Sequence, residues 1–345
     1  MNEMTAPAQT PAQKLTIKDF TSDQEVRWCP GCGDYAILKC MQRTLPELGA
    51  TRENTVFVSG IGCSSRFPYY MDTYGFHTIH GRAPAVATGV KLANPELDVW
   101  MITGDGDGLS IGGNHMMHVL RRDVDINILL FNNKIYGLTK GQYSPTSEPG
   151  TRAPSTPQGS IDPTLNPINF ALGSGARFAA RTVDTALKHM PGVFTRAHGF
   201  KGASFVEILQ NCIVYNDATW ADVTSKSVAK DKQLLLEHGE KMIFGAEENK
   251  GIRFNAQTFA LEVVTVGEGG ITEDDILTHD ETNLQLARML AELGASPDEP
   301  MAMGILYADP AETTYADAVH AQVDEFKGKR TLKDMIYSGQ TWEVS

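Results

Sequence analysis

The stretch DVWMITGDGDGLSIGG, residues Asp98 to Gly113, places an apolar strand directly before a glycine-rich turn that opens a helix. Diphosphates bind at turns of this kind, because backbone N–H groups and the helix dipole face the anion. The dinucleotide fingerprint G-x-G-x-x-G would need a glycine in place of Leu109, and the lysine-containing phosphate-loop motif is absent. The stretch therefore predicts a diphosphate site of a different kind.

Oxygen-bearing side chains surround this turn. Asp105 and Asp107 lie within it, and Asn133 follows the next apolar run, INILLF. The carboxyl ends of neighbouring parallel strands lie side by side, so Asp105 and Asn133 can present oxygens to one point. A carboxylate, an amide oxygen and a backbone carbonyl, completed by diphosphate oxygens and water, suit octahedral Mg²⁺. The alternative is a sharp turn with an asparagine cap and no metal.

Outward from this stretch, short apolar or β-branched runs alternate with helical patterns. The expected strands are NTVFVSG (54–60), DVWMITG (98–104), INILLFN (126–132) and ASFVEIL (203–209). The expected helices are DYAILKCMQRTLPEL (34–48), PAVATGVKLA (84–93), SIGGNHMMHVLRR (110–122) and DTALKHM (184–190). This alternation is typical of an α/β domain with a mostly parallel sheet flanked by helices.

We expect three parts along the chain. Residues 1–15, rich in Ala, Thr, Pro and Gln, read as a flexible tail. The α/β domain covers 16–225, and 226–345 reads as an acidic C-terminal extension of mixed structure with a helix at LQLARMLAELG (284–294). Within the domain, the long connection over 137–167 is expected to close over a site or to wrap a neighbouring chain.

Composition narrows the class of protein. The chain has 345 residues, of which 41% are hydrophobic and 21% charged, as in globular proteins. A net charge of −12 without a basic stripe disfavours nucleic acid as a partner. No apolar run approaches the length of about 20 residues that a membrane span needs, and the first residues lack the apolar region of a signal peptide. We therefore expect a soluble, cytoplasmic protein.

The cysteines form a pattern. Cys29 and Cys32 make a C-x-x-C pair, and Cys63 and Cys212 each follow a predicted strand, so they are expected at the same sheet edge as the turn. Four thiolates suit an iron–sulfur cluster and equally a zinc site. Cys40, in the helical ILKCMQR, reads as a buried apolar residue.

The motifs taken together resemble a known family. GDG at residues 104–106, followed after 25 intervening residues by NN at 132–133, is similar to the thiamine diphosphate motif. With WCPGCG, SGIGCSSR, HGRAPAVATGVKLANP and NNKIYGLTKGQYSPT, residues 24–225 resemble the β subunit of 2-oxoacid:ferredoxin oxidoreductases, and within that family the 2-oxoglutarate type. The resemblance implies a thiamine diphosphate-binding fold of the diphosphate type.

The resemblance also assigns site residues. Asp105, Asn133 and the carbonyl of Ile135 would hold Mg²⁺, and the four cysteines would hold a 4Fe-4S cluster. The residues expected to contact thiamine diphosphate are Gly31, Gly62, Ser64, His80, Gly104, Asp105, Gly106, Asp107, Asn133, Gly137, Leu138 and Thr139. An iron–sulfur cluster beside thiamine has a chemical logic, because it can remove electrons singly after decarboxylation.

Cations are needed for substrate carboxylates. We expect Arg66 to face the distal carboxylate of 2-oxoglutarate, since arginine binds carboxylates in a bidentate manner, and the alternative for Arg66 is a surface ion pair. Lys140 and Thr139 would hold the 2-oxo acid end or the cofactor. His80 is a candidate proton donor, with a structural hydrogen bond as its alternative.

Thiamine enzymes need a glutamate at the aminopyrimidine ring, carried by a second domain of similar fold, and this chain holds one copy of the α/β unit. We therefore expect an α subunit with the pyrimidine domain, in a heterodimer that pairs with another heterodimer. By the resemblance, the substrates are a 2-oxo acid and CoA, and the electron acceptor is ferredoxin. The alternatives are a pyruvate or branched-chain 2-oxo acid enzyme, a non-redox thiamine decarboxylase or carboligase, and a non-catalytic nucleotide-binding or scaffold subunit.

Overall fold

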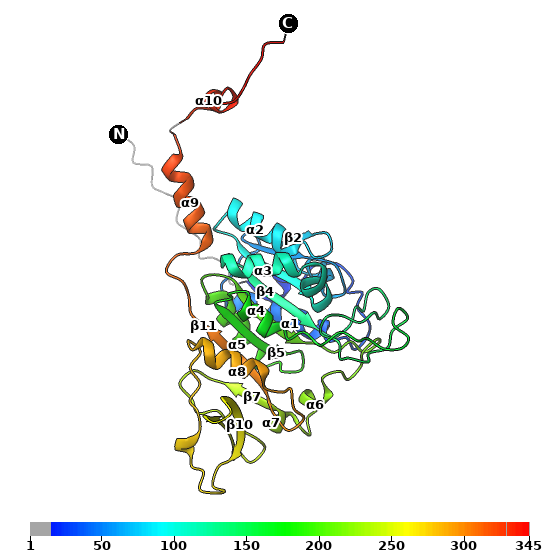
Figure 1. Ribbon diagram of the computed structural model, residues 1–345. Coiled ribbons are helices and arrows are strands. Elements are labelled where there is room, and N and C mark those ends of the chain that lie inside the picture. Colours follow the sequence, from blue (N-terminus) through cyan, green and yellow to red (C-terminus); the bar gives the residue numbers. More distant parts are fainter. Residues whose placement is uncertain (1–14, 329, 345) are drawn as a thin grey trace, which may run out of the picture.

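A sheet of eight strands forms the centre of the computed structural model, which describes residues 15–328 and 330–344 (Figure 1). The strands run in the order β2 (Tyr74–His77), β1 (Thr55–Ser59), β3 (Asp98–Gly104), β4 (Asn127–Asn132), β6 (Ser204–Leu209), β5 (Phe178–Val183), β11 (Met301–Ala308) and β7 (Gln233–Leu236). All neighbours are parallel except β11 with β5. The expected α/β fold is confirmed, as are the strands expected at β1, β3, β4 and β6. The expected tail lies, except for its last residue, outside the described residues.

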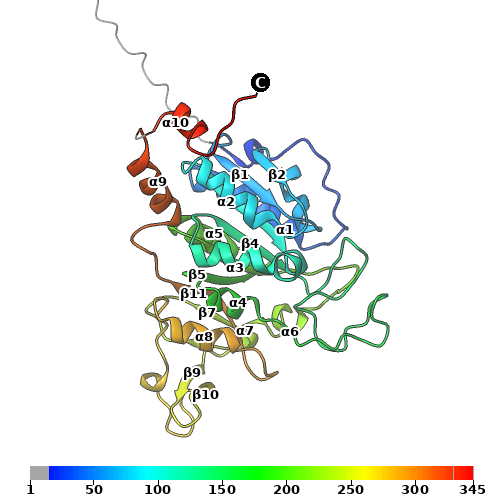
Figure 2. The same ribbon diagram turned by 45° about the horizontal axis from the view of Figure 1, so that its top comes forward.

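Helices cover both faces of the sheet (Figure 2). One core cluster contains apolar side chains of α2 (Ala83–Ala93), α3 (Gly113–Arg122), α4 (Pro167–Gly173) and α8 (Leu284–Glu292). The other contains those of α1 (Asp34–Glu47) and α5 (Met190–Gly199). Alternate strand residues, such as Met101 and Ile102, enter opposite clusters, because successive strand side chains point to opposite faces.

The prediction of a helix over 184–190 is wrong. Residues 184–189 form turns, and α5 begins at Met190 with Pro191 in its first turn. Proline suits that position because the missing N–H would have no partner inside the helix there. The helix expected over 284–294 is confirmed as α8.

Residues beyond 225 complete the sheet. β7 and β11 both come from this part of the chain, so the sheet does not end at the boundary that we expected there. β8 (Ile243–Phe244), β9 (Lys250–Asn255) and β10 (Ala260–Thr265) form a separate antiparallel sheet, and α6 (Ala221–Thr224) and α7 (Ala229–Lys232) are single turns. α9 (Tyr315–Phe326) begins against α2, and the chain then extends away from the body through α10 (Leu332–Ile336) (Figure 1). In the described ranges no helix is both long and apolar enough to cross a membrane.

The strand order determines where a ligand can bind. From β1 the chain moves outward to β2, and it then returns to β3 on the other side of β1. The loops that follow β1 and β3 therefore diverge, and a crevice forms outside the carboxyl ends of strands at such a point. The glycine-rich turn that begins at Gly104 lies at this crevice.

Candidate active site

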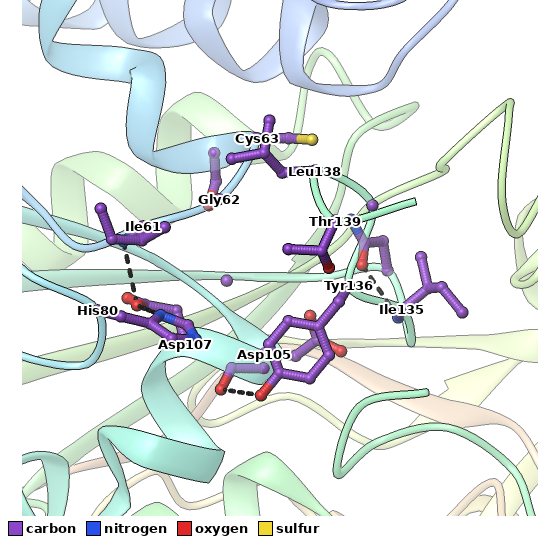
Figure 3. Close-up of a pocket in the computed structure, with 15 residues that line it drawn as sticks. Ile61, Gly62, Cys63, His80, Asp105, Asp107, Ile135, Tyr136, Leu138 and Thr139 are labelled. Atoms are coloured by element: carbon purple, nitrogen blue, oxygen red, sulfur yellow. Dashed lines mark hydrogen bonds and ion pairs between the residues drawn. The ribbon is translucent and has the colours of Figure 1, made fainter. Parts of the chain in front are cut away.

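A cavity opens at this point, between the segments that follow β1, β2, β3 and β4 (Figure 3). Ile135 lines it, and so do these residues expected at the cofactor: Gly62, Ser64, His80, Gly104, Asp105, Gly106, Asp107, Asn133, Gly137, Leu138 and Thr139. Gly31 is not among its lining residues. Gly31 lies in the cysteine loop, where its φ of +87° requires a left-handed backbone.

Tyr136 holds the turn after β3 in place. Its hydroxyl donates to the carbonyl of Gly106 at 2.8 Å (Figure 3). A Cβ atom at Gly106 would lie 2.3 Å from the tyrosine ring, so only glycine fits there. The backbone of the turn can therefore face the cavity closely, as binding of a diphosphate requires.

Asp105 is a buried carboxylate that accepts hydrogen bonds from two hydroxyls. Ser144 and Thr146 each donate to Oδ2 at 2.6 Å. Burial raises the pKa of Asp105 to about 6, although both hydroxyls lower it. A divalent cation at the cavity would offset this cost of burial, so the carboxylate fits a metal ligand.

The two asparagines after β4 have different surroundings. Asn132 is buried: its Nδ2 donates to Glu207, and its Oδ1 lies 2.9 Å from the Thr146 hydroxyl, whose one hydrogen goes to the nearer Asp105. Glu207 in turn pairs with the buried Arg181 at 2.7 Å. Asn133 instead lines the cavity with its neighbour Ile135. Of the two, Asn133 is therefore the one that can offer an oxygen to a metal.

Asp107 joins three loops. Its Oδ1 accepts from the backbone N–H of Ile61 at 3.0 Å, from that of Gly81 at 2.7 Å and from Nδ1 of His80 at 2.5 Å. Its Oδ2 accepts from Thr103 at 2.7 Å. Because both oxygens have partners within the protein, we interpret Asp107 as an anchor for the walls of the cavity. This contact fixes the ring of His80 through Nδ1. The other ring nitrogen, Nε2, takes no part in the contact with Asp107.

A second cavity adjoins the first. Its lining includes the four cysteines of the predicted cluster, Cys29, Cys32, Cys63 and Cys212. The two cavities share Cys63, Asn133, Gly137 and Leu138. A Cβ atom at Gly137 would lie 3.5 Å from the sulfurs of both Cys63 and Cys212, so a side chain there would fill the space between them.

The chemistry of these thiols fits a bound metal group. All five cysteines are free thiols, and burial raises the pKa of Cys32 and brings that of Cys63 to about 12. Among the described residues no group of three or more His, Cys, Asp or Glu side chains is placed so that it could hold a metal ion. Zinc needs its sulfurs about 2.3 Å from one point. A cluster of irons and sulfides is a larger body, and it takes its thiolates at separated corners.

The residues expected to bind substrate are dispersed. Arg66 lines the cysteine cavity, and its Nε donates to the hydroxyl of Tyr70 at 3.1 Å. Thr139 lines the first cavity, where its hydroxyl bonds to Gln142. Lys140 lines neither cavity, and its φ is +75°. As expected, Cys40 is buried in an apolar cluster with other α1 residues.

Sequence reasoning missed several residues of the site. Ser144 and Thr146 belong to the long connection before α4, and Gln210 directly follows β6. The run YSPTS at 143–147 is rich in hydroxyls, but nothing in the sequence ties it to Asp105. Gln210 lies two residues before Cys212, and this proximity is the sequence signal that points to it.

The fold is that of a thiamine diphosphate-binding enzyme domain. The family model for the thiamine pyrophosphate enzyme C-terminal binding domain matches residues 60–208. The chain is 48% identical to 2-oxoglutarate oxidoreductase subunit KorB of Mycobacterium tuberculosis, over 98% of this chain and 91% of that protein. It therefore belongs to the family of 2-oxoglutarate oxidoreductase subunits of the KorB type.

Two further comparisons agree. A 2-oxoacid:ferredoxin oxidoreductase β subunit of Aeropyrum pernix is 46% identical over 56% of this chain and 61% of its own length. A solved 2-oxoglutarate:ferredoxin oxidoreductase from Magnetococcus marinus superposes with a TM-score of 0.75 at 31% identity. It covers 98% of this chain and 100% of its own. The resemblance seen in the sequence is confirmed.

Proposed function

We propose that this chain is the thiamine diphosphate-binding β subunit of a 2-oxoglutarate:ferredoxin oxidoreductase. The reaction converts 2-oxoglutarate and CoA to succinyl-CoA and CO₂, with electrons passing singly to ferredoxin, and it also runs in reverse as a carboxylation. The relative from Magnetococcus marinus was solved with 2-oxoglutarate, coenzyme A and succinyl-CoA bound, which supports this set of substrates. The observation that carries the proposal is that the two cavities share four residues.

The first cavity suits thiamine diphosphate with Mg²⁺. Asp105, Asn133 and the carbonyl of Ile135 would hold the ion, and the turn at Gly106 would face the diphosphate. Bound thiamine diphosphate supplies the electron sink that decarboxylation of a 2-oxo acid requires. Asp107 orients His80, whose Nε2 would hold or move a proton at the cavity.

The second cavity suits a 4Fe-4S cluster on Cys29, Cys32, Cys63 and Cys212. Such a cluster supplies an acceptor for single electrons. Gly137 leaves the space between Cys63 and Cys212 open, and both cavities reach this space. Electrons would therefore have a short path from the cofactor to the cluster.

We propose that Arg66 selects the substrate. Thr139 and Lys140 would lie near the 2-oxo acid end of the bound substrate. The hydroxyl of Tyr70 steadies the guanidinium of Arg66 beside the cysteine cavity. Arg66→Ala should lower kcat/KM for 2-oxoglutarate by about tenfold or more and leave that for pyruvate nearly unchanged, because only 2-oxoglutarate has a distal carboxylate. An unchanged ratio of the two values would remove Arg66 from this role.

The chain is one subunit of a larger enzyme, as the names of its relatives state. We propose that an α subunit completes the site with its pyrimidine domain, in a dimer of heterodimers. Apolar side chains close to cavity residues support a covered interface here, because Ile79, Ile111 and Leu138 are 76%, 51% and 49% exposed.

The test is a ferredoxin-reduction assay with 2-oxoglutarate and CoA. The β chain alone should give no turnover, and addition of the α subunit should restore it. Turnover by pure β chain would contradict the proposed division of the site. Release of CO₂ or carboligation without reduction of ferredoxin would instead favour a non-redox thiamine enzyme, and pyruvate as the better substrate would favour the pyruvate type.

A further inference from the structure

Gln210 lies between the two cavities and contacts a residue of each. It follows β6 directly, and the residue is 1% exposed. Its Nε2 lies 3.3 Å from Sγ of Cys32, and its Oε1 lies 2.8 Å from Nδ2 of Asn133. One amide therefore touches both a proposed cluster ligand and a proposed magnesium ligand.

The backbone fixes the orientation of this amide. The Gln210 atom nearest the carbonyl of Asn211 lies 2.6 Å from it, and a carbonyl can only accept a hydrogen bond. That atom must be Nε2, which has a second hydrogen for Sγ of Cys32. The same carbonyl also accepts from the N–H of Gly33, which ties Gln210 to the loop of Cys29 and Cys32.

The orientation of Gln210 also decides that of Asn133. Because Oε1 of Gln210 can only accept, the Asn133 atom facing it must be the nitrogen Nδ2. Oδ1 of Asn133 is then on the other branch of the amide, where it accepts from the N–H of Ile135 at 3.2 Å. This is the oxygen that the magnesium site needs.

We propose that Gln210 is a positioning residue that serves both cofactors, an inference that rests on the proposed function. Its N–H donates to the thiolate of Cys32 and stabilises the more negative, reduced cluster, which raises the reduction potential. Its carbonyl oxygen holds Asn133 in the orientation that presents Oδ1 to Mg²⁺.

Two variants separate these roles, each purified with the partner subunit. Gln210→Met keeps the length but removes both hydrogen bonds. Gln210→Glu keeps an oxygen that can accept from Asn133. Its carboxyl group carries at most one hydrogen, and Sγ of Cys32 and the carbonyl of Asn211 compete for it. The control is Gln42→Met, which removes another buried glutamine amide, bonded to the carbonyl of Tyr70 at 3.1 Å.

We expect both Gln210 variants to reduce the equilibrium constant for cluster reduction by about tenfold. For one electron, this lowers the reduction potential by about 59 mV. EPR-monitored redox titration measures this potential. Affinity for Mg²⁺ at saturating thiamine diphosphate, followed by tryptophan fluorescence, should fall about 10- to 100-fold in Gln210→Met. In Gln210→Glu it should stay near the wild-type value, and Gln42→Met should change neither quantity.

Iron-loaded Gln210 variants with the wild-type potential would overturn the inference and leave the proposed function intact. If both variants lose the cluster, the wild-type protein with ¹⁵N in its glutamine side chains decides the question. Pulsed EPR of its reduced cluster should then show a nitrogen coupling, and the absence of that coupling would overturn the inference. Wild-type protein without iron would overturn the proposed function and the inference together.

Discussion

Thr146 is the residue on which the magnesium site most depends after its direct ligands. Its hydroxyl lies 2.6 Å from Oδ2 of Asp105 and 2.9 Å from Oδ1 of Asn132, so it joins the turn after β3 to the end of β4. Through Asn132 it connects with the buried pair of Glu207 and Arg181. The position of Asp105 is therefore set by a network that the sequence motif does not contain.

Thr146→Val should weaken Mg²⁺ binding about 10- to 100-fold, because Asp105 loses one of its two hydroxyl donors and keeps that of Ser144. Titration of Mg²⁺ at saturating thiamine diphosphate measures the effect. Thr151→Val is the matched control, since the Thr151 hydroxyl bonds to the backbone carbonyl of Glu148 in the same connection. Equal affinities in the two variants would show that Thr146 does not orient Asp105.

The turn after β3 offers a prediction at the scale of an element. In Gly106→Ala the new methyl group meets the ring of Tyr136, so the turn must shift and affinity for thiamine diphosphate should fall at least about tenfold. Gly113→Ala, at the start of α3, meets nothing within 4 Å and should stabilise the protein by about 0.5 to 1 kcal/mol. Calorimetry measures both. Tight cofactor binding by Gly106→Ala would contradict our account of the turn.

The packing of α5 on β3 should depend on pH. His198, near the end of α5, lies 3.3 Å from Asp98 at the start of β3, and this hydrogen bond raises the pKa of the histidine above 6.5. The pair therefore stabilises the folded state fully below pH 6.5, and the contribution is lost as the pH rises through the folded-state pKa.

His198→Gln should accordingly lose more stability at pH 6 than at pH 8, by about 0.5 to 1 kcal/mol because the pair is partly solvated. Urea denaturation at the two pH values measures the difference. An equal loss at both would mean that the charge of His198 contributes nothing.

At the same scale, the sequence predicted those elements whose pattern is local. β1, β3, β4 and β6 are apolar runs before turns, and the spacing from Asp105 to Asn133 follows from them. The sequence did not predict β5, because FAARTV contains Arg181. This arginine is buried only because Glu207 on β6 pairs with it. The sequence also did not predict the roles of Gln210, Ser144 and Thr146 in the site, because the partners that they contact there lie far away in the sequence.

At the scale of the whole molecule, the structure shows that the C-terminal third contributes strands to the central sheet. β11 pairs with β5 and β7, so the part that we expected as an extension includes two strands of the central sheet. The sequence could not show this, because nothing local in MAMGILYA states which strand it will meet.

Truncation separates the two portions of that region. A chain ending at Ser225 should not fold, because β5 would expose the edge that β11 covers. A chain ending at Gly328, which lacks the exposed α10, should unfold within a few degrees of the full chain. Circular dichroism on heating tests both. A folded short chain would show that β11 is dispensable.

The most direct test of the central claim is the cofactor content of anaerobically purified protein. We predict about four irons and four acid-labile sulfides per chain, little zinc, and an EPR signal of a reduced cluster after dithionite. Zinc in place of iron, or thiamine diphosphate with no metal besides Mg²⁺, would contradict the claim that the four cysteines form an electron-accepting site beside the thiamine cavity.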